Sequence, residues 1–226
     1  MNAHSAQDAA REIRIPAEAA SLEGDLDIPA GAQGIVLFAH GSGSSRHSPR
    51  NRWVAAQLQR ARIGTLLFDL LTRDEERRDI HTREHRFDIP LLARRLVHAA
   101  RWVDAQPELR PLPLGFFGAS TGSAAALVAA AALQKRVSAV VSRGGRPDLA
   151  GTDLPRVTAA TLLVVGGDDA DVLELNRGAQ ERLKCENRLA IVRGASHLFE
   201  EPGALEQVAT LATQWFAEHL GVAPGA

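Results

Sequence analysis

The sequence contains one cysteine, no tyrosine and almost no excess charge. Its 226 residues include 26 lysine and arginine residues and 27 aspartate and glutamate residues, which gives a formal net charge of −1. A single cysteine excludes both an intramolecular disulfide framework and a zinc site built on paired cysteines. The balanced charge removes the electrostatic basis for nucleic acid as a main partner, because binding to phosphates depends on a positive excess.

Long apolar runs are also lacking. The longest uncharged hydrophobic stretch, 116–133, is interrupted by glycine, serine and threonine, so it is not typical of a membrane span. Residues 1–20 carry several charged side chains where a secretory signal needs an apolar core. We therefore expect no membrane partner and a cytoplasmic location. The sequence offers no prediction of the oligomeric state.

Six short apolar runs, each closed by glycine or a polar residue, are typical of strands buried on both faces of a sheet. These runs are 35–38, 65–68, 114–117, 137–141, 161–165 and 189–192. Segments with the apolar spacing of helices are 51–62, 88–105, 120–133, 172–183 and 204–220. Their alternation predicts an α/β fold with a mostly parallel sheet and helices on both faces. Two weakly alternating segments, 11–16 and 22–28, indicate a short antiparallel pair before it.

The lengths of the connections favour a single domain over 11–220, with flexible tails at 1–10 and 221–226. The connection 142–160 is too short to hold a separate cap domain. A segment of mixed charge, 73–88, leaves the carboxyl end of the predicted strand 65–68. We expect it to form a solvated loop, and its position at the strand's carboxyl end makes it a candidate for the rim of a site.

Residues 118–122, Gly-Ala-Ser-Thr-Gly, match the pattern Gly-x-Ser-x-Gly. This pattern places a serine nucleophile on a sharp strand-to-helix turn, where the glycines let neighbouring backbone approach. The alternative is an ordinary tight turn. An apolar strand directly before the motif and a small-residue helix directly after it favour the nucleophile. The sequence therefore predicts Ser120 as the nucleophile.

A serine nucleophile needs a general base and a carboxylate that orients the base, in the chain order Ser, Asp or Glu, His. His197 follows the last apolar run, and Asp168 and Asp169 follow the run before it. The carboxyl ends of parallel strands are where open sheets place their sites. We predict Ser120, Asp169 and His197 as the catalytic triad. Asp168 stays open as the alternative acid, although the spacing of Asp169 from Gly166 favours Asp169.

An oxyanion hole needs two backbone N–H donors. We predict Thr121, which follows the nucleophile, and Ser42, which lies in the loop after the 35–38 run, with Gly43 as the alternative to Ser42. His40 in the same loop is predicted to hold the loop in place and not to act in catalysis. No cofactor or metal is expected, because no pair of histidines has ligand spacing on a predicted helix.

With these residues in place, the chain resembles the α/β-hydrolases, and within them the dienelactone hydrolase family, from residue 40 to residue 199. Three segments are similar to hydrolase domains that sometimes occur fused to a phosphoribosyltransferase domain: 142–148, 173–176 and 199–203. Dienelactone hydrolases proper use a cysteine nucleophile, whereas this chain has Ser120 in that place and its sole cysteine, Cys185, elsewhere. The resemblance implies an α/β-hydrolase fold without a cap and a general carboxylic-ester hydrolase.

The expected function is hydrolysis of a small-molecule ester through an acyl-enzyme. Arg143 and Arg146 lie in a loop on the side of the sheet where the triad is expected. Because a guanidinium binds a carboxylate well, they are candidate substrate-binding residues and predict a preference for small anionic esters. Two alternatives stay open: a binding or regulatory module on the same fold, and another acyl transfer such as thioester cleavage or perhydrolysis. The complete triad argues against the binding module.

Overall fold

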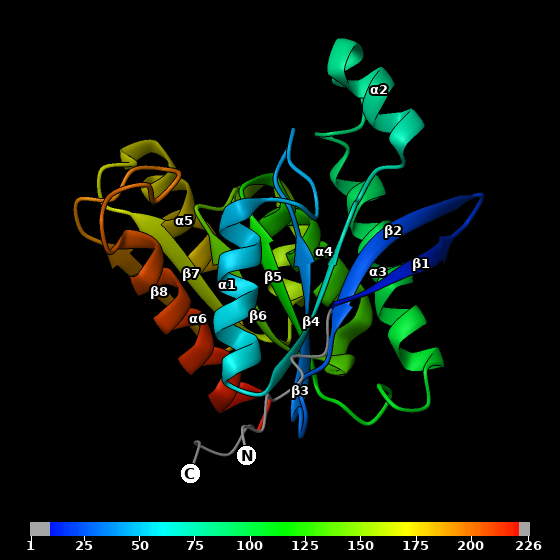
Figure 1. Ribbon diagram of the computed structural model, residues 1–226. Coiled ribbons are helices and arrows are strands. Elements are labelled where there is room, and N and C mark those ends of the chain that lie inside the picture. Colours follow the sequence, from blue (N-terminus) through cyan, green and yellow to red (C-terminus); the bar gives the residue numbers. More distant parts are fainter. Residues whose placement is uncertain (1–9, 222–226) are drawn as a thin grey trace.

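A computed structural model describes residues 10–221 and contains an eight-stranded sheet (Figure 1). The strands are β1 Arg11–Ala17, β2 Ala20–Asp27, β3 Gly34–Ala39, β4 Ile63–Phe68, β5 Leu114–Ala119, β6 Val137–Arg143, β7 Ala160–Gly166 and β8 Asn187–Val192. They lie side by side in the order β1-β2-β4-β3-β5-β6-β7-β8. β1, β2 and β4 pair antiparallel, and from β4 to β8 each neighbouring pair is parallel. The predicted antiparallel pair and mostly parallel sheet are confirmed.

Helices cover both faces of this sheet (Figure 1). The α-helices are α1 Pro49–Arg60, α2 Arg73–Thr82, α3 Ile89–Ala105, α4 Thr121–Leu133, α5 Ala170–Arg182 and α6 Ala204–His219. Two 3₁₀ segments, η1 Gln134–Arg136 and η2 Pro147–Arg156, follow α4 and β6. One apolar core lies between the sheet and α1 with α6, and the other lies between the sheet and α3 with α4.

Strands β3 to β7 are buried almost throughout, as the continuous apolar runs predict. The last apolar run, 189–192, forms a strand that is less buried than the others. β8 lies at the edge of the sheet and is only partly buried, with Ile191 44% exposed. The prediction that this strand is buried on both faces is wrong, because the helices on the two faces cover the edge of the sheet only in part.

The charged segment 73–88 is not a loop throughout, because α2 occupies its first ten residues. Thr72 starts this helix: its side chain accepts a hydrogen bond from the backbone N–H of Glu75, whose carboxylate accepts one from the N–H of Thr72. The pattern Thr-x-x-Glu was visible in the sequence and is the signal that predicts this helix. Figure 1 shows α2 standing out beyond the carboxyl ends of the strands. It is a single helix, and the predicted mostly parallel α/β sheet carries no separate cap domain among residues 10–221.

Among residues 10–221, no helix combines the length and the apolar character that crossing a bilayer requires. The predicted tails, 1–10 and 221–226, lie almost entirely outside the described residues. The extent of the domain, 11–220, therefore stays a prediction.

Candidate active site

Ser120 occupies the turn between β5 and α4. Its backbone has φ 50° and ψ −123°, which a residue with a side chain seldom adopts. Such strain is typical of a nucleophile elbow, in which the turn exposes the hydroxyl at the carboxyl end of the sheet. The N–H of Ser120 donates to the carbonyl of Arg143, 3.2 Å away, which ties the turn to β6.

The two glycines of the motif are required by close backbone contacts. A Cβ atom at Gly118 would lie 2.5 Å from Cα of Ser123, and one at Gly122 would lie 2.2 Å from the carbonyl oxygen of Ala39. Neither position has room for a side chain, because the obstructing atoms are backbone. The pattern in the sequence thus reflects the packing of α4 against the ends of β5 and β3.

His197 and Asp169 contact each other directly. Nδ1 of His197 lies 2.6 Å from Oδ2 of Asp169, which follows β7, whereas His197 lies in the loop after β8. This pairing leaves Nε2 of the ring as the nitrogen that can accept a proton. Asp168 is exposed, and its backbone N–H donates to the carbonyl of Ala195. Of the two candidate acids, the structure therefore brings Asp169 to His197.

Ser120 lies near both the histidine loop and the loop after β3. A Cβ atom at Gly41 would lie 3.1 Å from Cβ of Ser120. Gly144 directly follows Arg143, whose carbonyl holds Ser120. A Cβ atom at Gly144 would lie 3.7 Å from Cε1 of the His197 ring. No hydrogen bond joins Ser120 to His197 among residues 10–221. In hydrolases of this type, the bond between nucleophile and base tightens as the substrate binds.

The loop after β3 carries one of the predicted oxyanion donors. The N–H of Ser42 donates to Oγ1 of Thr121 at 2.9 Å, and Thr121 is buried at the start of α4. The contact joins the two residues predicted to supply the donors. To stabilise an oxyanion, the Ser42 N–H has to leave or share this bond. Gly43, the alternative, has φ +70° and lies at the next position of the same loop.

His40 holds this loop against the segment that follows β4, as predicted. Its Nε2 accepts a hydrogen bond from the backbone N–H of Leu70 at 3.0 Å, and its Nδ1 therefore carries the proton that is donated to the carbonyl of Gly41. The ring is buried, and the loss of solvation lowers the pKa of His40. A neutral ring with both nitrogens engaged has a structural role.

The two arginines predicted to bind substrate have different surroundings. One edge of the Arg146 guanidinium is taken by Asp148, because Nε and Nη2 donate to its two carboxylate oxygens at 2.9 and 2.8 Å. Arg143 has no carboxylate partner among the described residues: Nη2 lies 3.4 Å from Oδ1 of Asn51, and Nε and Nη1 are buried without a hydrogen bond. Burial and the nearby charge of Arg50 lower the pKa of Arg143 to about 10. Of the two, only Arg143 lacks a carboxylate partner among residues 10–221.

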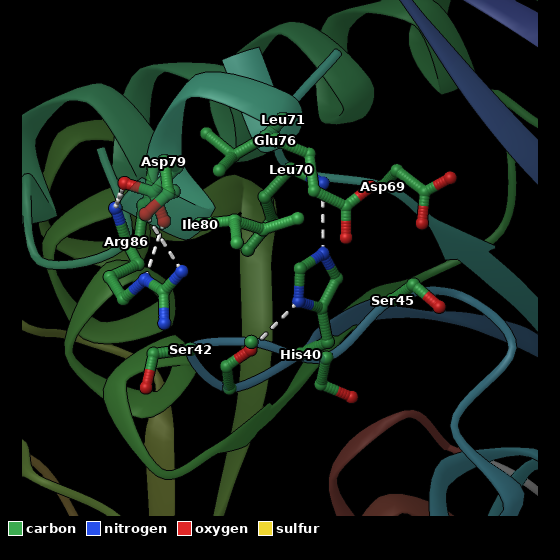
Figure 2. Close-up of a pocket in the computed structure, with 14 residues that line it drawn as sticks. His40, Ser42, Ser45, Asp69, Leu70, Leu71, Glu76, Asp79, Ile80 and Arg86 are labelled. Carbon is green, nitrogen blue, oxygen red and sulfur yellow. Dashed lines mark hydrogen bonds and ion pairs between the residues drawn. The ribbon is translucent and has the colours of Figure 1, made fainter. Parts of the chain in front are cut away.

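A cavity of about 340 Å³ adjoins the loop after β3 (Figure 2). Its walls come from residues 40–45, from residues 69–71 after β4, and from α2 with the segment that follows it. The charged segment 73–88 therefore borders a cavity at the carboxyl end of the sheet. The sequence did not predict the apolar residues of these walls, because they come from separate parts of the chain.

The residues that could hold a metal ion lie elsewhere. Within the described part of the chain, one group of three has ligand atoms within 4.8 Å of one another: Glu186, Glu218 and His219. Both glutamates are exposed. The group lies where β8 begins and α6 ends, at the opposite end of the sheet from Ser120.

Comparison with known proteins identifies the family. No protein-family model matches the chain. A crystal structure of a dienelactone hydrolase from Anabaena variabilis is 56% identical, covers 95% of this chain and 99% of its own, and superposes with a TM-score of 0.93. The chain belongs to the dienelactone hydrolase family. This membership supports hydrolase activity as the general assignment.

More distant solved structures confirm the predicted α/β-hydrolase fold. Est1E from Butyrivibrio proteoclasticus is 15% identical with a TM-score of 0.77, over 93% of this chain and 99% of its own. A dienelactone hydrolase-like promiscuous phosphotriesterase, P91, from metagenomic libraries is 20% identical with a TM-score of 0.74, over 94% and 98% of the two chains.

Curated relatives are longer than this chain. Putative phosphoribosyl transferases from two strains of Mycobacterium tuberculosis are 56% identical over 209 residues, which is 92% of this chain and 46% of theirs. The chain therefore spans about half the length of the curated relatives it matches.

Proposed function

We propose that the protein is a serine hydrolase that cleaves small carboxylic esters through an acyl-enzyme. The observation that supports this most directly is the 2.6 Å contact between His197 and Asp169, at the same end of the sheet as the strained elbow of Ser120. A binding module has no need of this combination. Membership of the dienelactone hydrolase family is consistent with the proposal, and so is the shared fold of a cold-adapted esterase from an Arctic metagenomic library.

In the proposed reaction, Nε2 of His197 takes the proton of the Ser120 hydroxyl as its oxygen attacks the ester carbonyl. Asp169 holds the ring in orientation and stabilises the imidazolium through Nδ1. The N–H groups of Thr121 and Ser42 stabilise the oxyanion of the tetrahedral intermediate. The intermediate collapses, and His197 returns the proton to the leaving alcohol. Water then attacks the acyl-enzyme by the same sequence and releases the acid.

The test combines labelling with turnover of p-nitrophenyl acetate. The wild-type protein should be labelled at Ser120 by a fluorophosphonate and should hydrolyse the ester. Ser120→Ala should lose labelling and at least about a thousandfold of the turnover, because triad residues act as a unit. His197→Ala should lose both as well.

Cys185→Ser is the matched control, because members of the family proper use a cysteine nucleophile. Cys185 lies outside the site, its sulfur contacts Thr161, and burial raises the pKa of its thiol. This variant should keep full activity. Retained turnover in a folded Ser120→Ala protein would refute the proposed nucleophile, and a folded wild-type protein without labelling or turnover would favour a binding module.

A further inference from the structure

The cavity beside the loop after β3 lies next to the proposed nucleophile. Gly41, Ser42 and Gly43 form part of its wall, and Gly41 packs against Ser120 on its other side. Its volume of about 340 Å³ is at the small end of the range for ligand-binding sites. Ser120 itself does not line the cavity, so a substrate that reacts with it would have to extend past Gly41 to enter.

The order of the strands indicates which part of an ester enters this cavity. His197 returns a proton to the leaving alcohol, so the alcohol has to lie on the side of His197. That residue follows β8, and Asp169 follows β7, whereas the cavity lies at the ends of β3 and β4. In the sheet, β5 with Ser120 separates these two sides. The acyl group is therefore the part that points into the cavity.

The cavity has an apolar component. Leu70, Leu71, Ile80 and Leu92 contribute to its walls, and Ile80 is 61% exposed. In Figure 2, Leu70 and Ile80 lie between Asp79 with Arg86 on one side and His40 with Asp69 on the other. Ile80 is the one large apolar residue of α2, which is otherwise charged or polar. An alkyl chain in the cavity would remove this surface from water.

The charge of the cavity is negative. Asp69, Glu76 and Asp79 line it, against a single guanidinium, that of Arg86. Arg86 is already engaged by Asp79, with Nε 2.5 Å from Oδ2. Burial acts to raise the pKa of Asp79, but the hydrogen bonds from Arg86 and from two backbone N–H groups outweigh it and lower that pKa. Asp79 therefore remains ionised.

Glu76 is the carboxylate that is left without a cation. Asp69 is paired with Arg46, which is shared with Glu23 and Asp25. Within residues 10–221, the Glu76 side chain has neither an ion pair nor a hydrogen bond, although it acts electrostatically on His40. Its charge is thus free to act on a ligand in the cavity.

We propose that this cavity is the acyl-binding subsite, which takes a short uncharged or cationic acyl chain, and that Glu76 excludes acyl chains that end in a carboxylate. The proposal rests on the proposed ester hydrolysis and names the substrate class for it. Like charges at the separation of a small cavity weaken binding of an anion and favour a cation.

Three ethyl esters of similar acyl length test the subsite: the butyrate, the hemisuccinate and the 4-aminobutyrate. Ethanol is a poor leaving group, so the terminal carboxylate or amine does not release it by intramolecular attack, and the acid formed is titrated at constant pH. For the wild-type protein, kcat/KM should be lowest for the hemisuccinate. Glu76→Gln should raise kcat/KM for the hemisuccinate relative to the butyrate by about 3- to 10-fold, and should lower the value for the 4-aminobutyrate. Asp74→Asn is the control, because Asp74 and Glu76 are both exposed residues of α2 and only Glu76 lines the cavity. It should leave these ratios within about twofold.

Filling the cavity provides a second, uncharged test. Ile80→Trp should lower kcat/KM for the butyrate at least about fivefold relative to the acetate, because only the longer chain reaches the wall. Unchanged ratios in both Glu76→Gln and Ile80→Trp, with Ser120→Ala inactive, would overturn the subsite and leave the proposed function standing. Full hydrolysis by Ser120→Ala, or no hydrolysis of any ester by folded wild-type protein, would overturn both.

Discussion

The two sides of Ser120 carry opposite charge. On the side of β3 and β4, three carboxylates and one guanidinium line the cavity. On the side of β6 and α1, Arg143 and Arg50 lie close enough to affect each other, and the guanidinium of Arg143 lies 6.0 Å from the centre of the Phe199 ring. Arg50 pairs with Glu200, which is 64% exposed, and Arg143 pairs with no carboxylate among residues 10–221.

Because of this difference, an anionic ester would meet different charges on the two sides of Ser120. The arginine-rich sequence suggests a general preference for anionic esters, but the structure assigns opposite charges to the regions that the two halves of an ester would meet. A carboxylate on the acyl chain would meet Glu76, and one on the alcohol would approach Arg143. The position of the charge in the ester, more than its presence, should then decide how well it is cleaved.

The largest expected effect tests which side holds the leaving group. Asp169→Asn should lower kcat by about 10⁴-fold, because the amide no longer holds His197 in the orientation and tautomer that return a proton to the alcohol. Asp168→Asn should cost less than about threefold, because Asp168 is exposed and contacts the site only through its backbone. Steady-state turnover of p-nitrophenyl acetate measures both. The reverse ranking would assign the acid to Asp168.

A smaller effect, on stability, concerns the cavity side of Ser120. There Asp79 accepts hydrogen bonds from the backbone N–H groups of His85 and Arg86. Because the pKa of Asp79 is lowered in the folded protein, its ionised form stabilises the segment above its unfolded pKa of about 4, and this stabilisation is lost as the pH falls further. Asp79→Asn should lower the free energy of unfolding by about 1–3 kcal/mol at pH 7.

Hydrogen exchange at different pH values separates this local effect from general acid unfolding. The amides of His85 and Arg86 should lose protection in the wild type as the pH falls below about 4, while amides of β5 remain protected. The same two amides should be unprotected at pH 7 in Asp79→Asn. Equal protection of these amides in the two proteins at pH 7 would contradict the role given to Asp79.

The smallest expected effect concerns the side of Ser120 that carries Arg143 and Arg50. Arg143→Ala should raise KM several-fold for 4-acetoxybenzoate, an acetate ester with an acidic alcohol, and less for the neutral phenyl acetate, since a charge-assisted hydrogen bond is lost. Arg146→Ala is the matched variant and should change either KM by less than about twofold, because Asp148 already engages that guanidinium. Equal effects of Arg143→Ala on the two esters would remove Arg143 from substrate binding.

Local patterns explain why so much of the fold was predictable. The parallel strands follow from continuous apolar runs, and the elbow follows from two glycines whose Cβ atoms would meet backbone. α2 was missed because it has one large apolar residue, Ile80, and so lacks the periodicity of a buried helix. The capping pattern that begins at Thr72 was the signal in the sequence from which this helix could have been predicted.

The charge of the site was less predictable, because it depends on partners distant in the sequence. Asp148 is two residues from Arg146, so that pair could have been anticipated. The burial of Arg143 depends on Asn51 of α1 and on Phe199, which no local pattern connects to it. The acidic cavity likewise combines Asp69 with α2, and its charge becomes visible only when each arginine has been assigned to its partner.

The hydrogen bond from the Ser42 N–H to the Thr121 hydroxyl has a consequence for selectivity between stages of the reaction. A donor that is already satisfied gains little by exchanging a neutral hydroxyl for the neutral carbonyl of a bound ester. It gains more when the carbonyl becomes an oxyanion, because a hydrogen bond to a charged acceptor is roughly twice as strong. In the proposed mechanism, the Thr121 hydroxyl therefore competes with the substrate for the Ser42 N–H. The intact ester does not displace it, whereas the tetrahedral intermediate does. The Ser42 N–H should then increase the rate of reaction and leave the affinity for the ester unchanged.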